Sequence, residues 1–326
     1  MTGPGDILVT GAGGFIGGAT ARLLAARGDG RIFGATRDGR DLGHGIAARA
    51  VDVRDLASLD TALRGVGGVV HCAYGDAATT IGGTNNVLAA AKRAGVRRVV
   101  HVSSIAVYAD IAGAVPETAP LLPPSGRGYA HWKAAAEAAC RATDGIEVTM
   151  LRPAIVYGPG SVQWVVTPAR RLLSGHWPDL GAVGGGNAGL VHVNDVAAAC
   201  ALALTAPVAG EAFNIVGPET ISWREWYARL AASLRVGGLA PASARAWRLR
   251  VLAGLPLKIG ARLPGFKALG ARAALALSPA ELRLFGVTAT YPTAKARALL
   301  GWQPAIGLEQ GLLDCMTWLR AAGIAP

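Results

Sequence analysis

The chain has 326 residues, of which 52% are hydrophobic and 16% are charged, and this is ample for a large buried core. It has neither the run of about 20 apolar residues that a membrane-spanning helix needs nor a signal peptide at its start. No Cys-x-x-Cys pair is formed by its cysteines, which are Cys72, Cys140, Cys200 and Cys315. We therefore expect a cytoplasmic protein without a metal site or disulfide framework. The net charge of +11 indicates an anionic partner, but no RNA- or DNA-binding motif accompanies it, and nucleic acid is therefore the least favoured partner.

The first half of the chain alternates short apolar runs with helical patterns. Such alternation is typical of βαβ units, and the near-continuous apolar character of the runs is typical of buried parallel strands. We expect strands at residues 7–10, 31–35, 48–51, 68–71, 99–102 and 148–151, and helices at 15–27, 84–94 and 129–141. The pattern predicts an α/β fold of the Rossmann type, with a doubly wound parallel sheet.

The second half is less regular. We expect a strand at 190–193, a helix at 194–205 and a strand at 212–216 that returns to the sheet. Beyond Gly217 the chain is mostly helical, with breaks predicted at Pro241, Pro256, Pro264 and Pro279. The sequence thus predicts a dinucleotide-binding domain of residues 1–156 and 190–217, and a smaller, mostly helical substrate domain of residues 157–189 and 218–326.

A glycine-rich turn lies between the first strand and the first helix. Gly11, Gly14 and Gly17 follow a Gly-x-x-Gly-x-x-Gly spacing, which differs from the commoner Gly-x-Gly-x-x-Gly. Glycines let the backbone approach a pyrophosphate, whose charge the N-terminus of a helix favours. The position of the turn predicts a dinucleotide site, whose residues here are Gly11, Gly13, Gly14, Phe15, Ile16 and Gly17.

Tyr129 and Lys133 are four residues apart, a spacing that puts both side chains on one face of a helix. A cation beside a phenol favours the phenolate and lowers its pKa toward neutral pH. Ser103 and Ser104 lie at a strand end about 25 residues before the tyrosine. Together with the glycine turn, these residues predict a nicotinamide-dependent oxidoreductase.

Motifs along nearly the whole chain resemble the extended short-chain dehydrogenase/reductase family, also called the NAD-dependent epimerase/dehydratase superfamily. They are the segments 10–17, 52–53, 102–108, 129–133, 151–159, 191–196 and 300–304. The resemblance implies that Ser104, Tyr129 and Lys133 are the catalytic serine, tyrosine and lysine. It also implies that Asp52 and Val53 contact adenine, that Cys72 and Ala73 flank the cofactor, and that Pro153 and Ile155 line the nicotinamide.

The chemistry of hydride transfer explains why these residue types are needed. A carbonyl that accepts hydride leaves charge on its oxygen, which Tyr129 would protonate and Ser104 would stabilise by a hydrogen bond. Lys133 would support the phenolate and hold the nicotinamide ribose. The dinucleotide itself carries the hydride.

The residues after the second strand favour NADP(H) over NAD(H). An NAD site usually has an acid there for the ribose 2′-hydroxyl, but Ala35 takes that place and Arg37 follows, which could pair with a 2′-phosphate. Asp38 is one residue late for the acid role, and strand ends can shift by a residue or two, so NAD(H) stays the alternative.

Three departures from the nucleotide-sugar enzymes point to a different substrate. Ile155 replaces their usual asparagine, residues 186–190 lack their diphosphate-binding arginine, and residues 105–106 lack the Asp-Glu pair of the dehydratases. Apolar and aromatic residues suit a hydrophobic alcohol or ketone instead, as in the 3β-hydroxysteroid dehydrogenase and dihydroflavonol reductase branches. They are Trp164, Trp177, Leu180, Trp223, Trp226 and the leucine-rich segment 249–277.

Other interpretations stay open. The chain could be a nucleotide-sugar 4-epimerase with tightly bound NAD, or a sensor that binds dinucleotide without turnover, although such sensors tend to lose the tyrosine. The basic segment 229–272 could be a solvated face, could attract an anionic substrate, or could contact an acidic membrane surface. The alanine-rich helices at 84–94 and 129–141 indicate a homodimer, as is common in this family.

Overall fold

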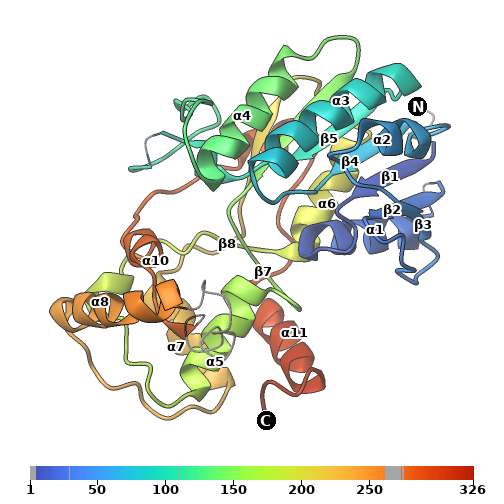
Figure 1. The fold of residues 1–326 in the computed structure, drawn as a ribbon. Helices are drawn as coiled ribbons and strands as arrows, with labels where there is room; N and C mark the ends of the chain where they lie inside the picture. Colours follow the sequence, from blue (N-terminus) through green and yellow to red (C-terminus); the bar gives the residue numbers. More distant parts are fainter. Residues whose placement is uncertain (1–4, 29, 110, 261–272, 274) are drawn as a thin grey trace.

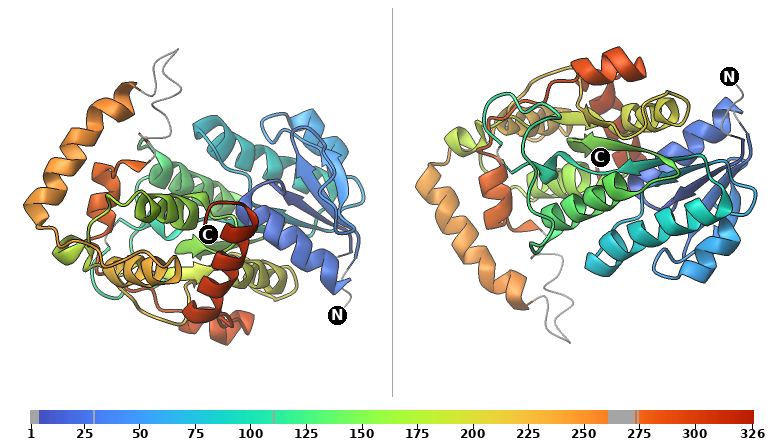
Figure 2. Two further views of the ribbon diagram at one scale, coloured as in Figure 1. Left: turned by 90° about the horizontal axis from the view of Figure 1, so that it is seen from below. Right: turned by 90° about the horizontal axis from the view of Figure 1, so that it is seen from above.

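The computed structural model describes residues 5–28, 30–109, 111–260, 273 and 275–326 (Figure 1). One lobe is built around an α/β sheet and a smaller lobe is mostly helical (Figures 1 and 2). Among the helices that the structure describes, none is long and apolar enough to cross a membrane.

The larger lobe contains a seven-stranded sheet whose strands are all parallel. Its order is β3-β2-β1-β4-β5-β6-β9, so the chain starts in the middle and reverses direction between β1 and β4. That reversal is where dinucleotides bind in doubly wound sheets. The strands are β1 (Ile7–Thr10), β2 (Ile32–Thr36), β3 (Ala47–Ala50), β4 (Gly68–His71), β5 (Arg98–Val102), β6 (Glu147–Pro153) and β9 (Ala212–Ile215).

Helices cover both faces of this sheet (Figure 1). On one face lie α1 (Phe15–Arg27) and α6 (Val193–Ala203), and on the other lie α2 (Leu56–Ala62), α3 (Gly83–Ala94) and α4 (Tyr129–Ala142). Alternate strand residues supply the two cores, because successive side chains point to opposite faces. Val70 and Val100 belong to the first core and Val69 and Val99 to the second. The predicted fold class is confirmed.

The smaller lobe has its own core, which contains the fully buried Trp223, Trp226 and Trp247. Its two-stranded sheet pairs β7 (Ile155–Tyr157) with β8 (Leu190–His192). Its helices are α5 (Thr167–Leu173), α7 (Trp223–Ser233), α8 (Ala244–Gly260), α10 (Pro279–Leu284) and α11 (Leu308–Ala321). Short 3-10 or π-helical segments are η1 (Ala78–Gly82), η2 (Ile105–Val107), η3 (Val162–Val166), η4 (Gly181–Gly184) and η5 (Ala296–Leu300).

The predicted elements agree with the structure to within two residues at most ends, with several corrections. Helices α2 and α5 and strand β7 were not expected. Asp55 caps α2 by accepting a hydrogen bond from the Ala57 amide. Pro256 does not break α8, which continues to Gly260. Pro279 starts α10 rather than ending a helix, as the first helical turn has no use for the missing amide hydrogen. Pro264 lies outside the described residues, and the predicted domain boundaries stay a prediction.

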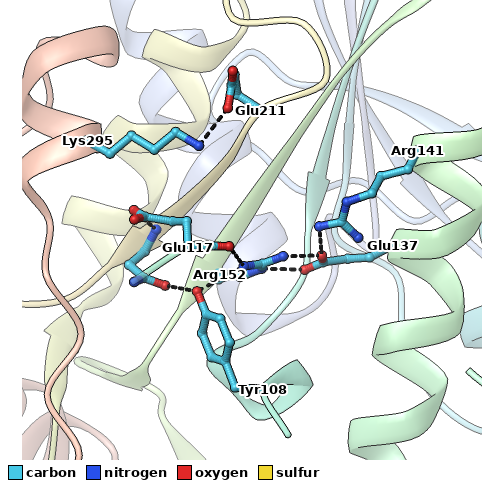
Figure 3. Close-up of polar contacts among 8 residues, drawn as sticks. Tyr108, Glu117, Glu137, Arg141, Arg152, Glu211 and Lys295 are labelled. Atoms are coloured by element: carbon cyan, nitrogen blue, oxygen red, sulfur yellow. Dashed lines mark hydrogen bonds and ion pairs between the residues drawn. The ribbon is translucent and has the colours of Figure 1, made fainter. Parts of the chain in front are cut away.

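A buried ion pair joins α4 to β6 (Figure 3). Arg152 on β6 donates two hydrogen bonds to Glu137 on α4, of 2.9 and 2.7 Å, and both side chains are fully buried. Arg152 also donates to the Tyr108 hydroxyl and to the Glu117 carbonyl oxygen. Burial alone would raise the pKa of Glu137, but the hydrogen bonds from Arg152 outweigh it and the pKa is lowered.

The same network reaches the last strand of the sheet. Tyr108 donates a hydrogen bond of 2.6 Å to Asn214 on β9, whose amide groups bind Glu117 and the Val115 carbonyl. The part of the loop from Tyr108 to Glu117 is therefore held by buried polar contacts. An ion pair in this position is costly to break, because the remaining charge cannot reach water.

The Glu137→Gln variant should be about 3–5 kcal/mol less stable than the wild type, because it leaves the buried Arg152 without a countercharge. Urea unfolding at constant pH measures the difference. Glu211→Gln is the matched control, because it removes one half of the exposed Glu211–Lys295 pair and should cost less than about 1 kcal/mol. Equal losses in the two variants would show that burial of the pair is unimportant.

Candidate active site

The glycine turn brings the backbone of β1 against the end of β4. Gly11 has φ +66°, a conformation that favours glycine, and a Cβ atom there would lie 2.9 Å from the Ala73 nitrogen. A Cβ atom on Gly17 would lie 2.3 Å from the Gly11 carbonyl oxygen. Both positions therefore require glycine for close approach, and Ala73 and Cys72 lie beside the turn as expected.

The start of α1 offers amide hydrogens to an anion. Gly14 is the N-cap and has no side chain to bind the amides of the first turn, where Phe15, Ile16 and Gly17 stand without an acidic neighbour. The Gly13 carbonyl oxygen accepts a hydrogen bond of 3.4 Å from Arg40, whose guanidinium adds positive charge beside the turn. A pyrophosphate fits this cradle, because unbonded amides and the helix dipole both favour negative charge.

Charged residues gather where β2 ends. Arg37 is exposed immediately after the strand, and Asp38, also exposed, accepts a hydrogen bond of 3.4 Å from Arg40. The pKa of Asp52 is lowered to about 2, chiefly by its hydrogen bond from Arg54 and to a smaller extent by Arg37. Arg37 and Asp52 thus share one end of the sheet, as both predicted roles require.

Val53 is held in place by α3. Its side chain packs so closely on Gly83 that a Cβ atom there would lie 2.7 Å from it, and Asn86 donates a hydrogen bond of 3.0 Å to its carbonyl oxygen. The segment of Asp52 and Val53 is thereby fixed beside the sheet end.

Helix α4 starts at Tyr129 and carries Lys133 one turn later. The tyrosine is 43% exposed, whereas Lys133 is only 3% exposed and donates a hydrogen bond of 2.7 Å to the Val102 carbonyl oxygen on β5. Burial lowers the pKa of Lys133 from its usual value to about 8. The lysine is thus anchored to the sheet and still carries its charge at neutral pH.

Ser104 meets Tyr129 from the other side. It is the N-cap of η2, where its hydroxyl accepts a hydrogen bond of 3.1 Å from the Ala106 amide. Burial raises the pKa of Tyr129, and a hydrogen bond with the Ser104 side chain opposes that rise. The lowering of the Tyr129 pKa expected from Lys133 is therefore not found, because burial dominates and the ammonium is bonded to Val102.

Tyr74 is a site residue that the sequence did not single out. It is 65% exposed, and its ring lies edge-on to that of Tyr129 at a centroid distance of 6.1 Å. The Lys133 ammonium is 5.7 Å from the same ring centroid. Its only sequence signal was its place two residues after Cys72, at the end of β4.

Two buried histidines lie behind the site. His71 bridges Thr10 and Thr84, with contacts of 2.7 and 3.0 Å, and its ring is 5.4 Å from that of His101. Burial, reinforced by the charge of Lys133, lowers the pKa of His71 to about 3 and that of His101 well below its usual value. Both rings are neutral at physiological pH, and the Lys133 ammonium is held by the Val102 carbonyl oxygen rather than by these rings.

Pro153 and Ile155 lie on either side of the passage from β6 to β7. The Ala154 amide between them donates to Ile215 on β9, and the Ile155 amide donates to Gly189, both at 3.0 Å. Ile155 is partly exposed at the start of β7. These bonds place it at the point where the chain leaves the large sheet for the smaller lobe.

Several residues proposed for the substrate side are core residues instead. Trp223 and Trp226 are fully buried and Leu180 is 1% exposed, because they fill the interior of the smaller lobe. Trp164 packs on Trp223 and Trp177 stacks on Tyr227. Within the leucine-rich segment 249–277, residues 261–272 and 274 lie outside the described residues.

The described part of the chain contains no group of three or more His, Cys, Asp or Glu residues that could hold a metal ion. All four cysteines are buried and free. Burial raises the pKa of the Cys72 thiol well above its usual value, so this thiol is a neutral packing group.

Comparisons with known proteins agree with this geometry. Residues 7–216 match the sequence profile of the NAD dependent epimerase/dehydratase family. The chain is 33% identical over 233 residues to sterol demethylase protein B of Methylococcus capsulatus, covering 64% of this chain and 69% of that protein. It is 27% identical over 308 residues to 3beta-hydroxysteroid-dehydrogenase/decarboxylase isoform 1 of Arabidopsis thaliana, covering 83% and 67%.

A solved structure is similar over almost the whole length. It is the dTDP-glucose 4,6-dehydratase DesIV of Streptomyces venezuelae with NAD and TYD bound, which is 25% identical and superposes with a TM-score of 0.73. The match covers 97% of each chain. The family resemblance expected from the sequence motifs is thus confirmed.

The low pKa of Lys133 predicts a pH-dependent stability. Between pH 8 and the usual lysine value the unfolded chain binds more protons than the folded one, so the cost of burying the charge is relieved as pH rises. The free energy of unfolding of the wild type, relative to that of Lys133→Met, should rise by roughly 2–3 kcal/mol from about pH 7 to about pH 10.

Urea unfolding of both proteins at the two pH values measures this change. Lys92→Met alters an exposed lysine, so its difference from the wild type should stay nearly constant. A Lys133→Met difference that is equally constant would mean that the lysine titrates as it does in water.

Proposed function

The chain belongs to the NAD dependent epimerase/dehydratase family, and from that premise we propose that it transfers hydride between NADP(H) and a hydrophobic alcohol or ketone. The observation that carries the proposal is the contact between Ser104 and Tyr129, with Lys133 one helical turn away. The arrangement supplies a proton donor, a hydrogen bond to the reacting oxygen and a fixed cation.

The bound dinucleotide supplies the hydride, and this chain supplies the proton and the alignment. In reduction, the Tyr129 hydroxyl donates its proton to the substrate oxygen as charge develops there. Ser104 donates a hydrogen bond to the same oxygen. Burial raises the pKa of Tyr129 above its usual value, so the phenol holds at neutral pH the proton that reduction requires. Lys133, held by Val102, would bind the ribose and stabilise the phenolate that remains.

A preference for NADP(H) is supported by the residues around β2. Arg37 is exposed at the strand end, and Arg40, which bonds to Gly13, adds a second positive charge beside the glycine turn. Asp38, the alternative acid for an NAD ribose, is already paired with Arg40. A 2′-phosphate would find two guanidinium groups here, whereas the Asp38 carboxylate that a 2′-hydroxyl would need already accepts a hydrogen bond from Arg40.

A hydrophobic substrate is supported by the absence of residues that are typical of nucleotide-sugar enzymes. Ile155 offers no hydrogen bond where those enzymes have asparagine, and Ile105 and Ala106 cannot supply the acid and base of a dehydratase. Asn187 is occupied, because its side-chain amide donates to the Ala289 carbonyl oxygen. The names of the two relatives, a sterol demethylase protein and a 3beta-hydroxysteroid dehydrogenase, agree with a steroid-like alcohol or ketone.

The alternatives differ in what happens to the cofactor. A nucleotide-sugar 4-epimerase would retain NAD through purification and consume none, and a sensor would bind dinucleotide without turnover.

We also propose a homodimer through α3 and α4, which lie side by side on one face of the sheet (Figure 1).

Tyr129→Phe should lower turnover of NADPH with a reducible ketone by about 100- to 10,000-fold, because it removes the proton donor and leaves the ring in place. Turnover is followed by the loss of NADPH absorbance, and NADPH binding by fluorescence should change little. Tyr74→Phe, on the neighbouring exposed ring, should stay close to the wild type. The mechanism would be wrong if Tyr129→Phe kept its turnover or if both variants lost it equally.

Arg37→Asp should reduce the ratio of kcat/KM for NADPH over NADH by roughly 10- to 100-fold, the effect of losing a charge-assisted hydrogen bond and adding a repulsive carboxylate. Steady-state kinetics with both dinucleotides measure the ratio. Arg64→Asp makes the same charge change at an exposed position after α2 and should leave the ratio unchanged. An unchanged ratio in Arg37→Asp would remove this residue from the argument.

A further inference from the structure

Helix α8 carries large apolar side chains on its outward face. Leu249, Leu252 and Ile259 are 58%, 60% and 63% exposed. The opposite face is buried in the core of the smaller lobe through Trp247 and Val251. A helix that is apolar on both sides has more apolar surface than its lobe covers, and this surface needs a partner of its own.

The exposed residues form one continuous strip. Leu249, Leu252 and Ile259 follow the three- and seven-residue spacings that return to the same side of a helix, opposite Trp247 and Val251. Figures 1 and 2 show α8 at the outer edge of the smaller lobe, on the side of the molecule away from β1–β3. Among the described residues, nothing covers more than half of these three side chains.

Positive charge lies within this strip, because Arg245 is four residues before Leu249 and Arg248 is four residues before Leu252. Arg245 and Arg248 are exposed on the same helix, as is Arg250, which donates a hydrogen bond of 3.2 Å to the His176 carbonyl oxygen. Between Glu225 and Glu281 the sequence has nine basic residues and no acidic one. Within α8 itself, residues 244–260 carry arginines and no acidic residue, so this helix attracts anions.

We propose that the outward face of α8 docks on a bilayer that contains anionic lipids. Leu249, Leu252 and Ile259 insert into the interface between head groups and acyl chains, and Arg245 and Arg248 bind lipid phosphates. A second copy of the chain fits this face poorly, because a symmetric contact would bring the two sets of arginines together. The inference goes beyond the proposed function and does not depend on it.

Flotation of the purified full chain with vesicles tests the proposal. The protein should bind vesicles of phosphatidylglycerol and phosphatidylcholine, bind much less to phosphatidylcholine alone, and lose binding as salt is raised. The Leu249→Glu/Leu252→Glu double variant should bind at least about tenfold more weakly. Arg245→Gln/Arg248→Gln, which leaves the apolar strip intact, should weaken binding about fivefold for each arginine removed.

Leu313→Glu is the matched control, because Leu313 is 57% exposed on α11, outside the proposed surface. It should bind like the wild type, and circular dichroism should show equal folding in all variants. Absence of binding by the folded wild type would overturn the proposal, as would equal binding by the leucine double variant. A fall in solution mass of that double variant from dimer to monomer, without vesicle binding by the wild type, would assign the face to a second copy instead.

Discussion

The ion pair between Glu137 and Arg152 is the constraint on which the site depends. It fixes α4 against β6 from within the core, where neither charge can exchange its partner for water. Because Lys133 lies one turn before Glu137 and Tyr129 lies one turn before Lys133, the pair fixes both reactive side chains relative to the sheet. The bond from Lys133 to Val102 then sets the depth of the ammonium. A network built for packing thereby also orients Tyr129, the proposed proton donor.

Burial sets the charge states around the proposed reacting oxygen. It keeps Tyr129 protonated, His71 and His101 neutral and Cys72 a thiol, and it leaves Lys133 with a pKa of about 8. Positive charge at neutral pH thus comes from Lys133 on the catalytic side, and from Arg37 and Arg40 at the end of β2. A dinucleotide bound as proposed would place its nicotinamide ribose beside Lys133 and its adenine ribose beside Arg37 and Arg40. The charge of Lys133 thus serves the proposed hydride transfer, and the charges of Arg37 and Arg40 serve the proposed cofactor preference.

The parts of the fold that depend on local chemistry could be predicted from the sequence. Continuous apolar runs marked the buried strands, and the glycines marked the turn that approaches Ala73. Contacts between residues far apart in the chain could not be predicted, because no sequence pattern links Glu137 to Arg152. The same holds for the hydrogen bond from the Trp302 indole to the Asp195 carbonyl oxygen. The pattern also could not separate core from ligand-binding aromatics, so Trp223 and Trp226 were assigned wrongly. Pro256 misled because it lies on an exposed side of α8, where water can satisfy the freed carbonyl group.

The fate of the hydride tests the central claim most directly. NADPH with deuterium at the transferred position should be consumed in a one-to-one ratio with a hydrophobic ketone, and mass spectrometry should find the deuterium on the carbinol carbon of the product. An enzyme that inverts a hydroxyl group would instead return its hydride to the same substrate and consume no free dinucleotide. Deuterium that stays on the dinucleotide across a broad panel of ketones, with no net oxidation, would contradict the account.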